Sequence, residues 1–91
     1  MKVTTKSGFE CEINERCLSD WRFTKAVARS HAEDDGVRMN AAADMVSLIL
    51  RENENKYYDY VAEHNDGIVD ETIVTDDLIS IVNQVKEIKN S

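Results

Sequence analysis

The stretch VRMNAAADMVSLILRE, residues 37–52, decides the fold of this chain. Alanine, methionine and leucine are strong helix formers, and the apolar residues from Ala41 to Leu50 cover more of a helix surface than a single stripe. A helix with so broad an apolar surface needs neighbours on several sides. The stretch therefore predicts a central helix over residues 37–52, and we expect the rest of the chain to pack around it.

A helix over residues 15–32 is predicted to precede this central helix. Asn14 or Ser19 can cap its N-terminus, and the acidic stretch that follows it ends in Gly36, which is typical of a turn. The residues expected to face the core are Leu18, Trp21 and Ala28, with Phe23 and Val27 as further candidates.

Two more helices are predicted after the central one, over residues 53–63 and 75–89. Thr75 can cap the last helix, which would place Asp76 and Asp77 in its first turn, where the helix dipole favours acidic residues. Its buried face should consist of Leu78, Ile81, Val82, Val85 and Ile88.

The N-terminal segment, residues 2–13, alternates in the manner of a β-hairpin. Phe9, Cys11 and Ile13 fall on one face of the second strand, and Gly8 suits the turn between the two strands. With 91 residues, no proline and no linker of small residues, the sequence predicts one small domain over residues 1–91. The fold class is α+β and mainly helical, with an N-terminal β-hairpin followed by three or four α-helices.

The net charge of −7 argues against a nucleic-acid-binding protein, because binding to phosphates draws on clustered cations. The charge is uneven. Residues 1–30 hold six cations and four anions, so the remainder of the chain carries −9. Arg22, Lys25 and Arg29 recur at helical spacing and form a basic stripe. This stripe either pairs with acidic groups of the fold or faces an acidic protein surface.

The residue types that carry catalysis or bind metals are scarce. Cys11, Cys17, His31 and His64 lack the short paired spacings of a zinc site, and no glycine-rich phosphate loop is present. We therefore expect no enzyme activity, no metal and no other cofactor. Because the sequence has neither a signal-peptide pattern nor a long apolar segment, we expect a cytoplasmic protein that does not bind a membrane.

Three tyrosines lie within four residues, at positions 57, 58 and 60. One stripe of a helix cannot bury all three rings, and tyrosine is enriched at protein interfaces. Their alternative role is to cap a small core with their hydroxyls in water. Together with the basic stripe they give a candidate protein-binding surface, which consists of Arg22, Lys25, Arg29, Tyr57, Tyr58 and Tyr60.

The run KSGFECEINE, residues 6–15, followed by LSDWRF, residues 18–23, resembles the opening of small proteins encoded in tail-gene clusters. These proteins are the tail assembly chaperones of long-tailed phages and prophages of Gram-positive bacteria. The similarity extends more loosely through the apolar stretch MVSLIL, residues 45–50, and the acidic C-terminal third. Cys17, Arg29 and the tyrosines do not match the pattern, so no functional residue is carried over through them.

The resemblance implies a non-enzymatic chaperone that binds the helical tape-measure protein, or another tail protein, during tail assembly. A helical surface can cover apolar stripes of such a client, and the net negative charge keeps the complex in solution. The alternative is an acidic regulatory module, similar to an antitoxin or an anti-repressor, that blocks a basic partner. The unpaired edges of the hairpin also leave self-association as a homo-oligomer open.

Overall fold

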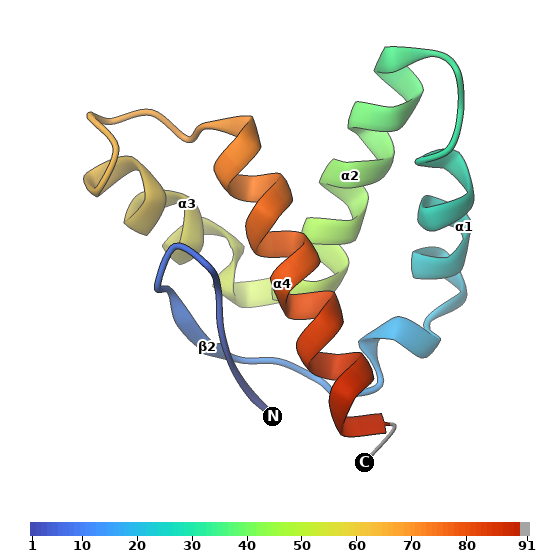
Figure 1. Cartoon of the computed structure of the whole chain (residues 1–91), viewed down its shortest axis with the longest axis horizontal. Coiled ribbons are helices and arrows are strands. Elements are labelled where there is room, and N and C mark those ends of the chain that lie inside the picture. The colour runs from blue at the N-terminus through green and yellow to red at the C-terminus, as the bar shows by residue number, and fades with distance from the viewer. Residues whose placement is uncertain (90–91) are drawn as a thin grey trace.

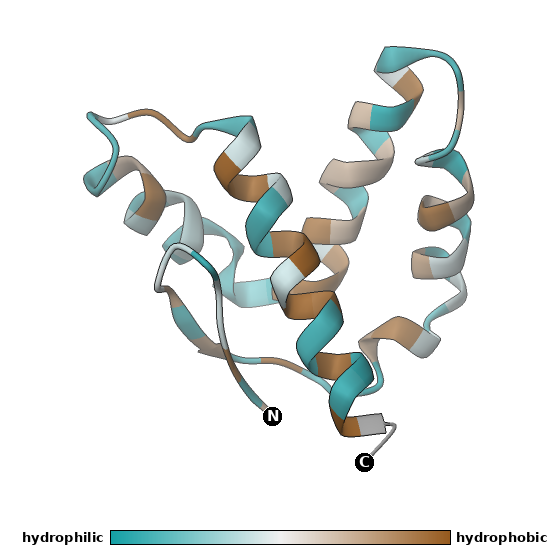
Figure 2. Ribbon diagram, in the orientation of Figure 1, coloured by the Kyte–Doolittle hydropathy of each residue, from teal (hydrophilic) through white to brown (hydrophobic). Residues whose placement is uncertain are grey.

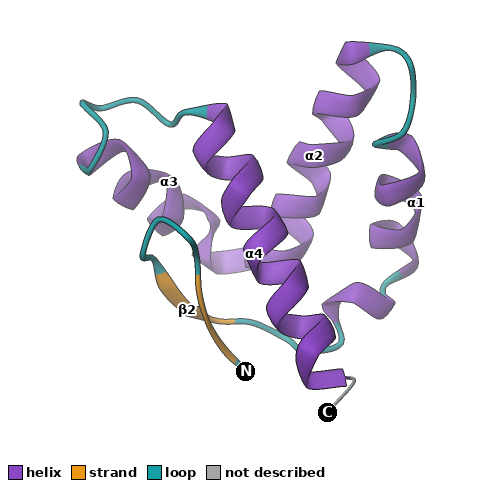
Figure 3. Cartoon of the chain, viewed as in Figure 1, coloured by secondary structure: helices purple, strands orange, loops and turns teal. Residues whose placement is uncertain are grey.

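The computed structural model describes residues 1–89, and its helices and strands are drawn in Figures 1 and 3. The prediction of an α+β, mainly helical domain with an N-terminal hairpin is confirmed. The single-domain prediction also covers residues 90 and 91, which lie outside the described part of the chain. The elements are β1 (Lys2–Thr4), β2 (Glu10–Glu12), the 3₁₀ turn η1 (Cys17–Ser19), α1 (Trp21–Arg29), α2 (Asp35–Leu50), the 3₁₀ turn η2 (Arg51–Asn53), α3 (Glu54–Glu63) and α4 (Glu71–Lys89).

The hairpin pairs β1 with β2 in antiparallel register, with Val3 opposite Cys11. Its turn needs the glycine at position 8, which has a φ of 104°. A Cβ atom there would also lie 2.8 Å from the hydroxyl of Tyr60 on α3. The hairpin is thus shaped to dock against the helices rather than to stand alone.

The four α-helices of the described residues surround a core to which every layer contributes. α1 runs antiparallel beside α2, and α4 crosses in front of α2, while α3 and the hairpin lie on the side away from α1 (Figure 1). The molecule is flat, with extents of 35 × 34 × 20 Å. The most deeply buried large side chains are those of Val3, Ile49, Tyr57, Val61 and Val85, together with the carboxylate-bearing Asp77.

Aspartates set the N-termini of the helices and move them away from the predicted bounds. α1 begins at Trp21 because the Asp20 side chain accepts a hydrogen bond from the backbone N–H of Arg22 at 2.8 Å, so the helix predicted over 15–32 starts later and ends at Arg29. Residues 17–19 form only a 3₁₀ turn. Asp34 caps α2 in the same way, which places Gly36 inside the first turn of α2 instead of before it.

The start of α4 is also earlier than predicted. Asp70 accepts a hydrogen bond from the backbone N–H of Thr72 at 2.8 Å, and the helix begins at Glu71 rather than at residue 75. Aspartate is the stronger N-cap, so Thr75 becomes an ordinary helical residue. As a consequence, Asp76 and Asp77 lie in the second turn, and Asp77 faces the core.

Candidate protein-binding surfaces

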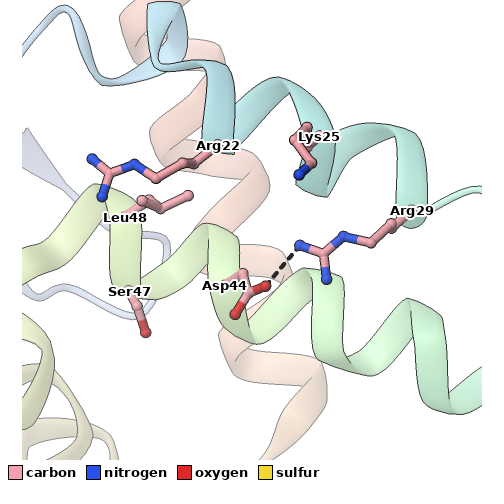
Figure 4. A pocket seen from close by; sticks show the side chains of 6 residues that line it. All are labelled: Arg22, Lys25, Arg29, Asp44, Ser47 and Leu48. Carbon is pink, nitrogen blue, oxygen red and sulfur yellow. Dashed lines mark hydrogen bonds and ion pairs between the residues drawn. The ribbon is translucent and has the colours of Figure 1, made fainter.

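The three residues of the basic stripe lie together over one shallow groove between α1 and α2, which we call the basic groove (Figure 4). Its volume is about 570 Å³, and its floor is formed by α2. Figure 4 shows the guanidinium group of Arg22 above Leu48, and Arg29 reaching Asp44. The helical spacing seen in the sequence therefore does gather Arg22, Lys25 and Arg29 on one surface.

Most of the positive charge of the basic groove is already paired. Arg22 binds Asp20 through two side-chain hydrogen bonds of 3.0 and 2.6 Å, and Arg29 binds Asp44 at 2.7 Å. The bonds from Arg22 hold the pKa of Asp20 well below its ordinary value, at about 2. Lys25 forms no ion pair within the described residues. The basic groove thus keeps only a small positive excess with which to attract an acidic partner.

The structure places the tyrosines away from the basic groove. They lie on α3, and α2 and α4 separate them from α1 (Figure 1). Tyr57 is 1% exposed and belongs to the core, so its ring is not at the surface. Tyr58 and Tyr60 are half-buried, and their hydroxyls donate to Glu54 at 2.7 Å and to the backbone carbonyl of Ser7 at 3.1 Å. A role in protein binding therefore stays a prediction only for Tyr58 and Tyr60.

A buried carboxylate explains the position of Tyr57. Asp77 is 1% exposed and accepts hydrogen bonds from the Tyr57 hydroxyl at 2.6 Å, from the Ser7 hydroxyl at 2.6 Å and from the Ser7 backbone N–H at 2.8 Å. Burial and this contact with a carboxylate raise the pKa of Tyr57 far above its ordinary value. Asp77 thereby joins α3, α4 and the hairpin turn. The sequence offered one signal for it, a carboxylate on the apolar face of the last helix.

An apolar groove that the sequence did not predict lies between α2 and α4. α4 crosses the C-terminal part of α2, and the two helices diverge from the crossing toward their N-termini (Figure 1). The space between them has a volume of about 340 Å³, and we call it the apolar groove. Its apolar walls include Met39, Ala42 and Ala43 of α2, Val69 of the loop that leads into α4, and Val74 and Leu78 of α4.

Large apolar side chains remain exposed along the apolar groove. Met39 is 61% exposed and Val69 is 40% exposed, although both line the groove. Figure 2 shows the apolar colour in the loop that leads into α4, where Ile68 is also exposed. Single exposed apolar residues are common on proteins, but a groove lined by several of them is typical of a binding site.

The opposite flank of α4 carries a second apolar hollow, between α4 and α1. Its volume is about 410 Å³, and Val27 and Ile79 lie exposed along it, with Ile79 53% exposed. Leu78 lies between this hollow and the apolar groove and lines both. Apolar surface therefore borders α4 on two sides.

Trp21, which the sequence placed in the core, is 71% exposed. α1 buries Phe23 and Ala26 against α2 instead, and Ala28 is exposed with Trp21. The prediction of the buried face was therefore wrong for Trp21, Val27 and Ala28, whereas Phe23, one of the further candidates, is buried. The indole ring consequently stands beside the basic stripe at the surface, where tryptophan and arginine are frequent contributors to protein binding.

Neither a metal-binding cluster nor a membrane-spanning helix is found in the described part of the chain. Among residues 1–89, no group of three histidine, cysteine, aspartate or glutamate side chains is placed to hold a metal ion, and no disulfide joins Cys11 to Cys17. None of the described helices is both long enough and apolar enough to cross a membrane.

Comparisons with known proteins give one finding. The family model described as ORF D-335-like protein matches residues 44–91, which make up just over half of the chain. The matched segment includes the second half of α2, α3 and α4, and so contains parts of both walls of the apolar groove. No curated protein and no solved structure matches the chain.

Proposed function

The chain belongs to the family of ORF D-335-like proteins, and within this family we propose that it is a non-enzymatic tail assembly chaperone of a phage or prophage. In this proposal it works in the cytoplasm of the bacterial host. It binds the tape-measure protein before the tail tube polymerises around it. The client is suggested by the resemblance of residues 6–23 to tail assembly chaperones.

One structural observation supports a chaperone over other classes of protein. Large apolar side chains line the accessible apolar groove between α2 and α4, where Met39 and Val69 are each at least 40% exposed. Surfaces of this kind bind the apolar faces of client helices. The net charge of −7 would keep such a complex in solution while the apolar surface is covered.

Co-expression with the tape-measure protein of the same tail cluster tests the proposal. We expect the chain to keep this client in the soluble fraction and to co-purify with it when the salt concentration is raised to about 1 M, because apolar contacts are not screened by salt. An acidic inhibitor of a basic partner, the alternative function, would instead release its partner steeply as salt rises. A tape-measure protein that stays insoluble and does not co-purify would contradict the chaperone proposal.

The same experiment tests the surface predicted from the sequence. A variant with Arg22→Gln, Lys25→Gln and Arg29→Gln removes the basic stripe without touching the core, and Tyr58→Phe with Tyr60→Phe removes the hydroxyls of the two half-buried tyrosines. Loss of the client from either variant would locate binding there. Full retention by both variants would exclude the basic stripe and the two hydroxyls from binding.

A further inference from the structure

We propose that the apolar groove between α2 and α4 binds an amphipathic helix of the client that carries lysine or arginine beside its apolar stripe. This inference rests on the proposed function, because it names the part of the client that is recognised. It selects one of the two apolar surfaces that border α4 and gives the chemistry of its occupant.

The shape of the groove suits a helix. On α2 its lining residues are Met39, Ala42, Ala43 and Val46, and on α4 they are Glu71, Val74, Thr75 and Leu78. Both sets follow the spacing i, i+3, i+4, i+7, so each wall is one continuous helix face. Between the walls, the short side chains of Ala42 and Ala43 leave room for large side chains of a third helix.

The apolar residues of the groove gain from being covered. Met39 and Val69 stand on opposite walls and remain exposed, while Leu78 at the crossing closes the inner end. A helix placed along the groove would remove both exposed side chains from water at once. The half-buried ring of Tyr58 lies on α3 and completes the lining.

Charge indicates which amphipathic helix fits. Glu71 is the charged group among the residues that line the groove, and no lysine or arginine does so. The Glu71 carboxylate forms no ion pair with any described residue. In a chain with a net charge of −7, the unpaired carboxylate at the rim of an apolar groove favours a cation on the partner.

A second copy of this chain is the weaker occupant. α1 is the described helix with a basic stripe, but its apolar residues Phe23 and Ala26 are already buried against α2. Trp21 and Ala28 are exposed beside its cations, but Thr24 and Lys25 lie between them on that face, so α1 offers no continuous apolar stripe to a neighbouring copy. The complementary helix must come from another protein.

Three synthetic peptides of about 18 residues, labelled with fluorescein, test the proposal by fluorescence anisotropy with the full chain. The first carries a leucine stripe at i, i+3, i+4, i+7 flanked by lysines, the second has the same stripe flanked by glutamates, and the third has the lysine composition in scrambled order. We expect the first to bind, the second to bind at least about tenfold more weakly, and the third not to bind.

Neutral substitutions locate the site. The double variant Met39→Gln and Ala43→Gln should weaken binding of the lysine peptide by at least about tenfold, because the two glutamines make the groove polar and fill it without adding charge. Ile79→Gln is the matched control, because Ile79 is an exposed apolar residue on the opposite flank of α4, and it should bind as the unchanged chain does. Glu71→Gln should reduce the preference for lysine over glutamate flanks by about threefold or more. Circular dichroism melting confirms that each variant is folded.

Several outcomes would overturn the inference. Equal binding of the lysine and glutamate peptides would contradict the proposed preference for a cationic helix. Equal losses of binding in the groove variant and in Ile79→Gln would contradict the proposed location of the site. A dimer in sedimentation that only the groove variant dissociates would show that a second copy occupies the groove. Co-purification of the tape-measure protein with the groove variant at the unchanged level would defeat the inference and leave the proposed function standing. Binding of the lysine peptide without retention of the tape-measure protein would contradict the proposed function and leave the groove as a site for a cationic amphipathic helix.

Discussion

On one flank of α4, polar side chains hold the hairpin, while on the flank that faces the N-terminal half of α2 apolar side chains line an open groove. Asp77 and Gln84 belong to the first flank, where Gln84 donates to the backbone carbonyl of Thr4 at 2.7 Å and accepts from its N–H at 3.3 Å. Val74 and Leu78 belong to the second and line the apolar groove with Met39. The same helix thus separates the contacts that stabilise the fold from the surface left for a partner, and substitutions should affect one without the other.

Asp77→Ala should have the largest effect on stability. It leaves the buried hydroxyl of Tyr57 and the part-buried backbone N–H of Ser7 without their acceptor, and we expect the free energy of unfolding to fall by about 3–5 kcal/mol in urea denaturation. The adjacent Asp76 is the control. Its ion pair with Lys6 at 3.4 Å is exposed, so Asp76→Ala should cost less than about 1 kcal/mol. Similar losses in the two variants would contradict the special role of the buried carboxylate.

High pH should weaken the same flank. Because the pKa of Tyr57 is raised in the folded chain, the folded state keeps a proton that the unfolded chain releases near pH 10. The stabilisation is fully present below pH 10 and is lost above it, at about 1.4 kcal/mol per pH unit for this one proton. Tyr58, whose pKa is raised to about 12 by burial and by Glu54, adds a loss of the same sign.

Tyr57→Phe provides the comparison for this pH dependence. It should cost about 1–2 kcal/mol at neutral pH, because the carboxylate loses one of its donors, and its unfolding free energy should fall less steeply than that of the unchanged chain between pH 9 and 11. Parallel curves for the two proteins, measured by urea denaturation, would show that Tyr57 does not carry the effect.

Gln84→Ala should have a smaller effect, about 1 kcal/mol. The amide of Gln84 spans to the backbone of Thr4, but this contact is exposed to water, which can replace the lost hydrogen bonds. Asn83→Ala, at an exposed neighbouring position on α4, gives the background for such a change. Equal melting temperatures of the two variants would contradict this expectation.

Met39→Ser, on the groove flank, should change the free energy of unfolding by no more than about 0.5 kcal/mol. The side chain is mostly in solvent, so little packing is lost. Ile49→Ala on the same helix removes a buried side chain and should cost about 2–5 kcal/mol. A large loss in Met39→Ser, in urea denaturation, would mean that the groove residues support the fold.

The charges on the two faces of α1 predict which face is buried better than the size of its apolar residues does. Trp21 is the largest apolar residue of the segment, and its size suggested a core position. However, the face that carries Trp21 also carries Lys25, and burying that unpaired cation would be costly. The face with Phe23 and Ala26 has cations only at its edge, where Arg22 and Arg29 are paired with Asp20 and Asp44, and the structure buries that face.

Alternation of apolar residues predicted the hairpin, and strong helix formers with a broad apolar surface predicted the central helix. These patterns could not predict that Asp77 pairs with Tyr57. Tyr57 and Asp77 are 20 residues apart on different helices, and only the angle between α3 and α4 brings their side chains together. The apolar groove is equally a product of the crossing between α2 and α4, which no local pattern contains.

The attachment of the hairpin to α4 also has a consequence for synthesis of the chain. Ser7 must wait for Asp77, 70 residues later, before its hydrogen bonds can form. At ordinary translation rates of about 5–20 residues per second this is a delay of roughly 4–14 s. During this time the first strands lack their contacts with α4, and a two-stranded hairpin is only marginally stable by itself. Nascent chains stalled before residue 77 should therefore leave the N-terminal segment open to proteases, and chains that extend well beyond it should protect that segment.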